Sequence, residues 1–139
     1  MKKQKNLGIL VSAIFGFLIV IGSYLNYKIF PSNSSRIKIG ATYMTMNNDF
    51  YKVLNNEIEK VVKENNDILY TRDPALDVDK QKQQIDSFIQ KEVDIIIINP
   101  VSANSPKLIK ALKDAKKAGI KIVVVDSQLS DDSSVDTTI

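Results

Sequence analysis

The stretch Val93-Asp94-Ile95-Ile96-Ile97-Ile98-Asn99-Pro100 decides the fold. Its four consecutive β-branched residues do not alternate with polar ones, which is typical of a strand in a parallel sheet that helices cover on both faces. The run ends at Asn99 and Pro100, and proline cannot continue a strand ladder. Because open α/β sheets carry their sites at the carboxyl ends of the strands, we expect Asn99 at that edge.

Strand-like and helix-like segments alternate on both sides of this stretch. Further strands are predicted at residues 36–42, 67–72 and 121–126. Apolar residues between the strands recur at helical spacing and predict three helices. The order β-α-β-α-β-α-β therefore predicts an α/β fold, a doubly wound and Rossmann-like parallel sheet with strand order 2-1-3-4.

The predicted helices have recognisable start and stop signals. Asn48 or Asp49 can cap the first helix, and Asp77 can cap the second. Ser105 followed by proline starts the third helix, and Gly119 supplies its left-handed stop. We interpret the polar face of the second helix, made of Lys, Gln and Asp, as solvated.

The sequence after the fourth strand is polar and acidic over residues 127–136. Residues 135–139 then begin what resembles another strand where the sequence stops. A sheet interrupted there has an uncovered edge, so we expect the domain to be truncated.

A long apolar segment precedes the predicted sheet. Residues 7–25 carry no charge over 19 positions and follow Lys2, Lys3 and Lys5. As a helix this segment is about 28 Å long, which matches the hydrocarbon thickness of a bilayer. The lysines predict a cytoplasmic amino terminus. We therefore expect a single-pass transmembrane signal anchor within residues 1–30, a linker at 31–35 and an extracellular domain at 36–139; the alternative is a cleaved signal peptide.

Composition narrows the chemistry. The chain has no cysteine and no histidine, which excludes disulfides, thiolate nucleophiles, histidine bases and the usual zinc ligands, so we predict no cofactor and no metal. Of the charged residues, 15 of the 19 basic ones and all 16 acidic ones lie after residue 30, so the folded part is about neutral and no nucleic-acid partner is predicted. The chain also lacks a nucleophile paired with a base and a phosphate-binding glycine loop, which argues against an enzyme.

Three loops should meet at the carboxyl edge of the sheet, and they carry side chains suited to a polyol. A carboxylate accepts hydrogen bonds from neighbouring hydroxyls, an amide both donates and accepts, and an aromatic ring can cover the C–H face of a sugar. The predicted ligand-binding residues are Asn48, Phe50, Tyr51, Asn99, Asp126 and Gln128.

Each of these residues also has a structural interpretation. Asn48 can be only a helix cap, and Asp126 can bond only loop amides. One of the rings of Phe50 and Tyr51 can enter the core. Asn99 can satisfy only the backbone of the loop that follows it.

Residues 40–128 resemble the amino-terminal lobe of the ribose/galactose-type periplasmic sugar-binding proteins, the type 1 periplasmic binding proteins. The resemblance is carried by Thr45-Met46-Asn47-Asn48-Asp49-Phe50-Tyr51, by residues 93–100 and by residues 118–126. It implies that Asn48, Phe50, Tyr51 and Asp126 contact a sugar. Ribose-type members have Pro where Asp49 stands and Arg where Ser127 stands, and they have a second lobe that closes over the sugar.

The resemblance implies a membrane-anchored extracellular solute-binding protein for a sugar or similar polyol. Its expected partners are a small-molecule carbohydrate, the membrane through residues 7–25, and an ABC transporter permease or a membrane sensor kinase. The alternative is a truncated single lobe without a ligand site of its own, which acts by protein contact or is non-functional.

Overall fold

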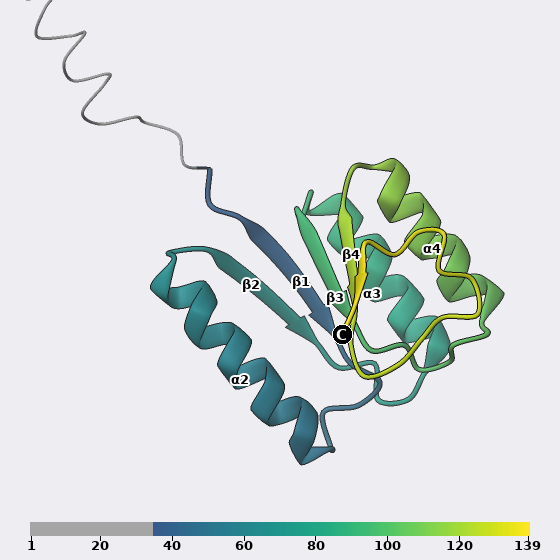
Figure 1. The fold of residues 1–139 in the computed structure, drawn as a ribbon, viewed down its shortest axis with the longest axis horizontal. Helices are drawn as coiled ribbons and strands as arrows, with labels where there is room; N and C mark the ends of the chain where they lie inside the picture. Colours follow the sequence, from purple (N-terminus) through teal and green to yellow (C-terminus); the bar gives the residue numbers. More distant parts are fainter. Residues whose placement is uncertain (1–34) are drawn as a thin grey trace, which may run out of the picture. The chain divides into compact units, whose positions relative to one another are not determined.

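The computed structural model describes residues 35–139, in which parallel strands alternate with helices (Figure 1). The elements are β1 (Lys38–Thr42), α2 (Asp49–Glu64), β2 (Ile68–Arg72), α3 (Val78–Gln90), β3 (Ile95–Ile98), α4 (Pro106–Lys117), β4 (Lys121–Val124) and β5 (Thr137–Thr138). The sheet order is β2-β1-β3-β4-β5, and all neighbours are parallel. The predicted α/β class and the order 2-1-3-4 are therefore confirmed, and β5 adds the strand expected near residue 139.

The helices begin where the sequence predicts. The Asn48 side chain caps α2 by accepting a hydrogen bond from the Phe50 N–H at 2.9 Å. Asp77 caps α3 by accepting from two backbone N–H groups, and Ser105 caps α4. Gly119 follows α4 at a φ of +85°, a conformation that a residue with a side chain rarely adopts.

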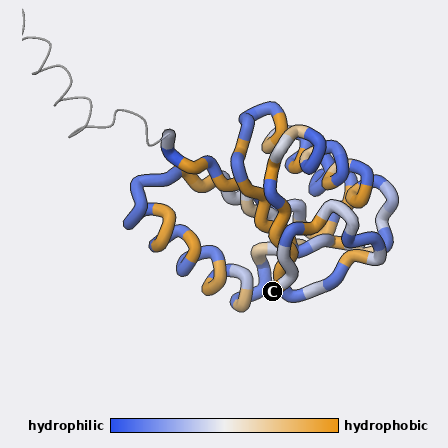
Figure 2. The backbone as a smooth tube through the Cα atoms, turned by 45° about the horizontal axis from the view of Figure 1, so that its top comes forward, coloured by the Kyte–Doolittle hydropathy of each residue, from blue (hydrophilic) through white to orange (hydrophobic). Residues whose placement is uncertain are grey.

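The main core lies on the face of the sheet that α3 and α4 cover. These two helices pack side by side, and α2 lies on the opposite face (Figure 1). The strand residues that point toward α3 and α4 are fully buried, and they are Ile96, Ile98, Ile122 and Val124. Figure 2 shows apolar strands at the centre and helices whose turns carry both apolar and polar residues.

The opposite face of β3 is less covered than the sequence predicts. Ile95 and Ile97 point to the α2 side and are only half-buried, as is Val123 on β4. The expectation of helices over both faces of β3 is therefore wrong for residues 35–139. The reason is that α2 lies over β2, and within the described residues it is the only helix on its side of the sheet.

Gly40 on β1 allows α3 to approach the sheet closely. A Cβ atom at this position would lie 2.6 Å from Cγ of Phe88, well inside van der Waals contact. We expect Gly40→Ala to lower the free energy of unfolding by about 1–3 kcal/mol, as overpacked cores do. Urea denaturation followed by circular dichroism measures this change.

The same substitution in a Phe88→Leu background is the control for this contact. Because leucine lacks the ring that the new Cβ meets, the added cost of Gly40→Ala should fall there. An equal cost in both backgrounds would contradict the assigned contact.

No helix within residues 35–139 is long and apolar enough to span a membrane. The predicted transmembrane segment, residues 7–25, lies outside the described residues.

Candidate ligand-binding site

The loops after β1, β3 and β4 meet at the carboxyl edge of the sheet, where the sequence predicts a site. Asn99 links all three. Its Oδ1 accepts a hydrogen bond from the Met44 N–H at 3.4 Å, and its Nδ2 donates to the Val125 carbonyl at 2.9 Å. Two of the loops are thus held together by the side chain of the third.

The role of Asn99 in this arrangement is structural. Only 1% of the residue is exposed, and both ends of its amide are engaged by backbone groups. Of the two interpretations left open by the sequence, this geometry favours support of the loops. Because the residue is almost completely buried, a ligand would reach it only if the loops around it moved.

Phe50 and Tyr51 differ sharply in exposure although they are adjacent. Phe50 is 53% exposed, whereas Tyr51 is 3% exposed. Tyr51 stacks on the fully buried ring of Tyr43 with centroids 5.6 Å apart and planes 14° apart. One ring of the pair therefore enters the core, and the other presents a free apolar surface at the start of α2.

Asp126 lies two residues after the end of β4 and remains exposed. Its backbone has a φ of +54°, in the left-handed region that aspartate tolerates better than most residues. The Tyr51 hydroxyl donates a hydrogen bond to Oδ2 of Asp126 at 2.9 Å, which connects the first loop to the last. Burial, followed by this hydrogen bond and the charge of Asp126, raises the pKa of Tyr51 to about 12.

The remaining predicted residues occupy the rim of the same edge. Asn48 is exposed even though its Oδ1 caps α2, so capping and ligand contact are compatible. Gln128 is also exposed. The hydroxyl of Ser127 is buried without a hydrogen-bond partner among the described residues.

Gln81 on α3 supports this edge and was missed by sequence reasoning. It is fully buried, its Nε2 donates to the Asn99 carbonyl at 2.9 Å, and its Oε1 accepts from the Val101 N–H at 2.7 Å. The interpretation of all glutamines of this helix as solvated is therefore wrong. The available signal was its position one turn before the buried Ile85, on the apolar stripe of the helix.

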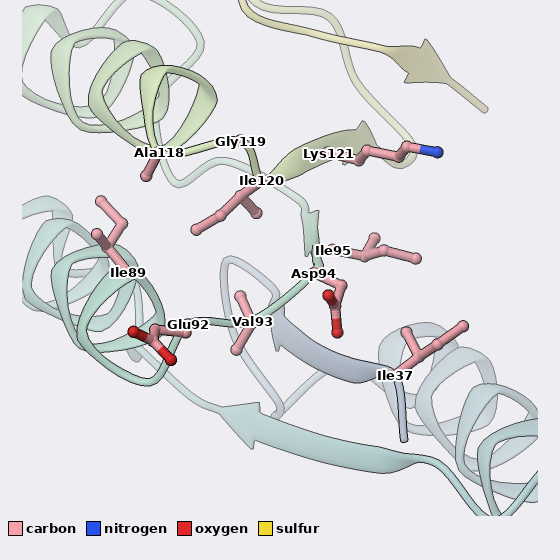
Figure 3. A pocket seen from close by; sticks show the side chains of 10 residues that line it. All are labelled: Ile37, Ile89, Glu92, Val93, Asp94, Ile95, Ala118, Gly119, Ile120 and Lys121. Carbon is pink, nitrogen blue, oxygen red and sulfur yellow. The ribbon is translucent and has the colours of Figure 1, made fainter. Parts of the chain in front are cut away.

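A cavity of about 690 Å³ lies at the opposite, amino-terminal edge of the strands (Figure 3). Its walls are mostly aliphatic, with Ile89, Val93 and Ile120 facing the same space. Glu92 and Asp94 are the carboxylates that line it, and Oδ2 of Asp94 already accepts a hydrogen bond from the Lys38 N–H at 2.8 Å. The cavity contains none of the predicted ligand residues, and Asp94 has the structural role predicted for it.

A comparison with known protein families tests the family resemblance of the sequence. The model of the periplasmic binding protein domain matches residues 39–139. The chain belongs to the periplasmic binding protein family. It represents the amino-terminal lobe of a ribose/galactose-type member, and its relatives are solute-binding proteins, not enzymes.

Individual periplasmic binding proteins show how much of a member this domain represents. It is 32% identical over 99 residues to the ribose import binding protein of Bacillus subtilis, covering 69% of this chain and 32% of that protein. It is 34% identical over 91 residues to a putative rhizopine-binding protein of Rhizobium meliloti, covering 65% of this chain and 29% of that protein. The chain thus spans about a third of the length of these curated relatives.

A solved periplasmic binding protein structure confirms the fold. It is an ABC transporter solute-binding protein from Mycobacterium smegmatis with bound glycerol, which superposes with a TM-score of 0.67 at 27% identity. The match covers 76% of this chain and 35% of the other.

Proposed function

We propose that this domain is one half of an extracellular binding protein for a sugar or similar polyol. In this proposal it delivers the ligand to an ABC transporter permease, or reports it to a membrane sensor kinase. Two relatives support the ligand class, since one is a ribose import binding protein and one was solved with bound glycerol.

The observation that carries this proposal is the pairing of a carboxylate with an aromatic face at the carboxyl edge. The hydrogen bond from Tyr51 brings Asp126 beside the first turn of α2, where Phe50 packs edge-on against Tyr51 with centroids 5.3 Å apart. The Asp126 carboxylate can accept two ligand hydroxyls while the exposed Phe50 ring covers a C–H face. Asn48 and Gln128 offer amides at the same rim.

The residue after Asp126 restricts the class of sugar or polyol that this edge can bind. Ser127, with a buried hydroxyl, follows Asp126 where ribose-type members carry arginine. Within residues 35–139 Asp126 forms no ion pair, so this wall offers a carboxylate acceptor without a guanidinium beside it. We therefore infer that the ligand is a neutral polyol with adjacent hydroxyl donors, and we expect anionic sugars to bind poorly.

A single lobe supplies only one wall of such a site. Ligand pockets normally bury most of a small ligand, whereas Phe50 and Asp126 lie on an open edge. In our proposal a second lobe of a longer polypeptide closes over the ligand. Residues 7–25 would anchor the protein in the membrane with its amino terminus in the cytoplasm, which rests on their sequence alone.

Ligand titration of the protein purified from the cells that produce it tests this function. Isothermal titration calorimetry against a panel of neutral sugars, cyclic polyols and anionic sugars should find binding in the neutral group. The intact mass of the same preparation shows whether it is heavier than the 15.6 kDa of this chain. A heavier protein that binds none of the neutral compounds would contradict the proposal.

The half-covered sheet face favours a second candidate function. Ile95, Ile97 and Val123 form an aliphatic surface that a protein partner can cover. A product of 15.6 kDa that binds no ligand and forms a specific crosslink in its native membrane would support protein contact as the function.

A further inference from the structure

Tyr51 is held rigidly although it lies beside the open edge. Its ring stacks on Tyr43 and meets the edge of Phe50, and the side chain is almost completely buried. Burial raises the pKa of Tyr51, so its hydroxyl keeps its proton at physiological pH and remains a donor. This hydroxyl is therefore a fixed donor in the wall of the site.

The backbone of Asp126 is also fixed. Its N–H donates to the Ile139 carbonyl at 2.8 Å, which ties it to the residue that follows β5. The preceding residue, Val125, donates its N–H to Ile98 at 2.9 Å and accepts from Asn99 through its carbonyl. The peptide group that precedes Asp126 is therefore held at both its carbonyl and its N–H.

With its backbone held, Asp126 can still change the orientation of its exposed carboxylate by rotation of the side chain. The Tyr51 hydroxyl donates to Oδ2 at 2.9 Å, a hydrogen bond to a charged acceptor. A carboxylate has about four acceptor positions, so this bond leaves Oδ1 and part of Oδ2 for a ligand. The hydrogen bond therefore orders the carboxylate and leaves acceptor positions free for a ligand.

We propose that Tyr51 is a positioning residue that holds the Asp126 carboxylate in its ligand-binding orientation and does not itself contact the ligand. The inference rests on the proposed function of the carboxyl edge. It reassigns Tyr51 from the ligand-contact role that the family resemblance implies, because the ring faces the core and its hydroxyl is committed to Asp126.

A fixed carboxylate has a consequence for specificity. Two acceptor positions at set directions match one geometry of adjacent hydroxyls and disfavour the epimer in which one hydroxyl points elsewhere. A carboxylate that rotates freely would adapt to both, and it would lose ordering entropy on binding either. Tyr51 should therefore increase both the affinity and the discrimination between epimers.

The variant Tyr51→Phe isolates this effect because it keeps the ring and removes only the hydroxyl. We expect the dissociation constant of the best ligand to rise about three- to tenfold, the cost of ordering one free side chain. Discrimination between that ligand and its epimer should fall. Tyr70→Phe on β2 is the matched control, since it removes a tyrosine hydroxyl away from this edge and should leave binding unchanged.

A double-mutant cycle with Asp126→Asn separates positioning from packing. If Tyr51 acts through the carboxylate, Tyr51→Phe should cost less in the Asp126→Asn background than in the unaltered protein. Equal costs in both backgrounds, no loss on Tyr51→Phe, or tighter binding by this variant would overturn the proposal.

A ligand-free measurement distinguishes failure of this inference from failure of the proposed function. In the full chain in detergent micelles, the Hα–Hβ couplings of Asp126 report its side-chain rotamer by nuclear magnetic resonance. We expect one rotamer in the unaltered protein and averaged couplings in Tyr51→Phe. Averaged couplings in both would refute the positioning role, whereas a single rotamer in a protein that binds no polyol would refute only the proposed ligand class.

Discussion

Replacing Asp126 with asparagine should weaken polyol binding by about 10- to 150-fold. The substitution keeps the shape of the side chain but removes its charge, and a hydrogen bond to a charged group contributes about 1.5–3 kcal/mol. One amide position also becomes a donor, which opposes the ligand hydroxyls that the carboxylate accepts. Calorimetric titration of the two proteins with the best neutral ligand measures the loss.

Asp132→Asn is the control for this substitution. Asp132 is exposed in the same acidic loop, so its replacement changes the net charge equally without touching the edge beside Phe50. It should change affinity less than twofold, as rim charges do. Equal losses from the two variants would indicate a general charge effect and would contradict a ligand contact at Asp126.

Truncating Phe88 to alanine should lower the free energy of unfolding by about 3–5 kcal/mol. The ring is fully buried in the main core and lies against the backbone of Gly40 on the interior strand β1. Its removal leaves a cavity between α3 and the sheet, which neighbouring side chains can fill only in part. Chemical denaturation followed by circular dichroism measures the change.

Val53→Ala on α2 is the matched control for core truncation. Val53 is 62% exposed, so the same kind of truncation should change stability by no more than about 0.5 kcal/mol. A loss at Phe88 no greater than that at Val53 would contradict the assignment of the core to the α3 and α4 face.

The predictions for Phe88 and Asp126 are connected through α3. Phe88 holds α3 on the sheet, and α3 carries Gln81, whose amide holds the loop after β3. Asn99 in that loop then connects Met44 to Val125, next to Asp126. A destabilised α3 should therefore disturb the ligand edge, although no residue of α3 was predicted to contact a ligand.

The sequence predicted the architecture well because it depends on local patterns. The apolar run from Ile95 to Ile98 indicates a strand, and the helix caps and Gly119 mark where helices begin and end. The parallel order follows because strands and helices alternate along the chain. The position of Asp126, Phe50 and Asn48 at the carboxyl edge was predicted correctly, because they follow strand ends, and their contact with a ligand stays a prediction. The coverage of β3 was predicted wrongly, because four isoleucines report only that the strand avoids water and not which element covers it.

The sequence by itself determined which residues form strands and helices, and which edge of the sheet carries a carboxylate, amides and aromatic rings. Only the tertiary structure decided how these side chains divide between support and exposure. Tyr51 is buried and Phe50 is not, and the side-chain amides of Asn99 and Gln81 form hydrogen bonds with backbone groups. The physical reason is that hydrogen bonds and burial depend on neighbours more than 15 residues away, which residue type and spacing do not specify.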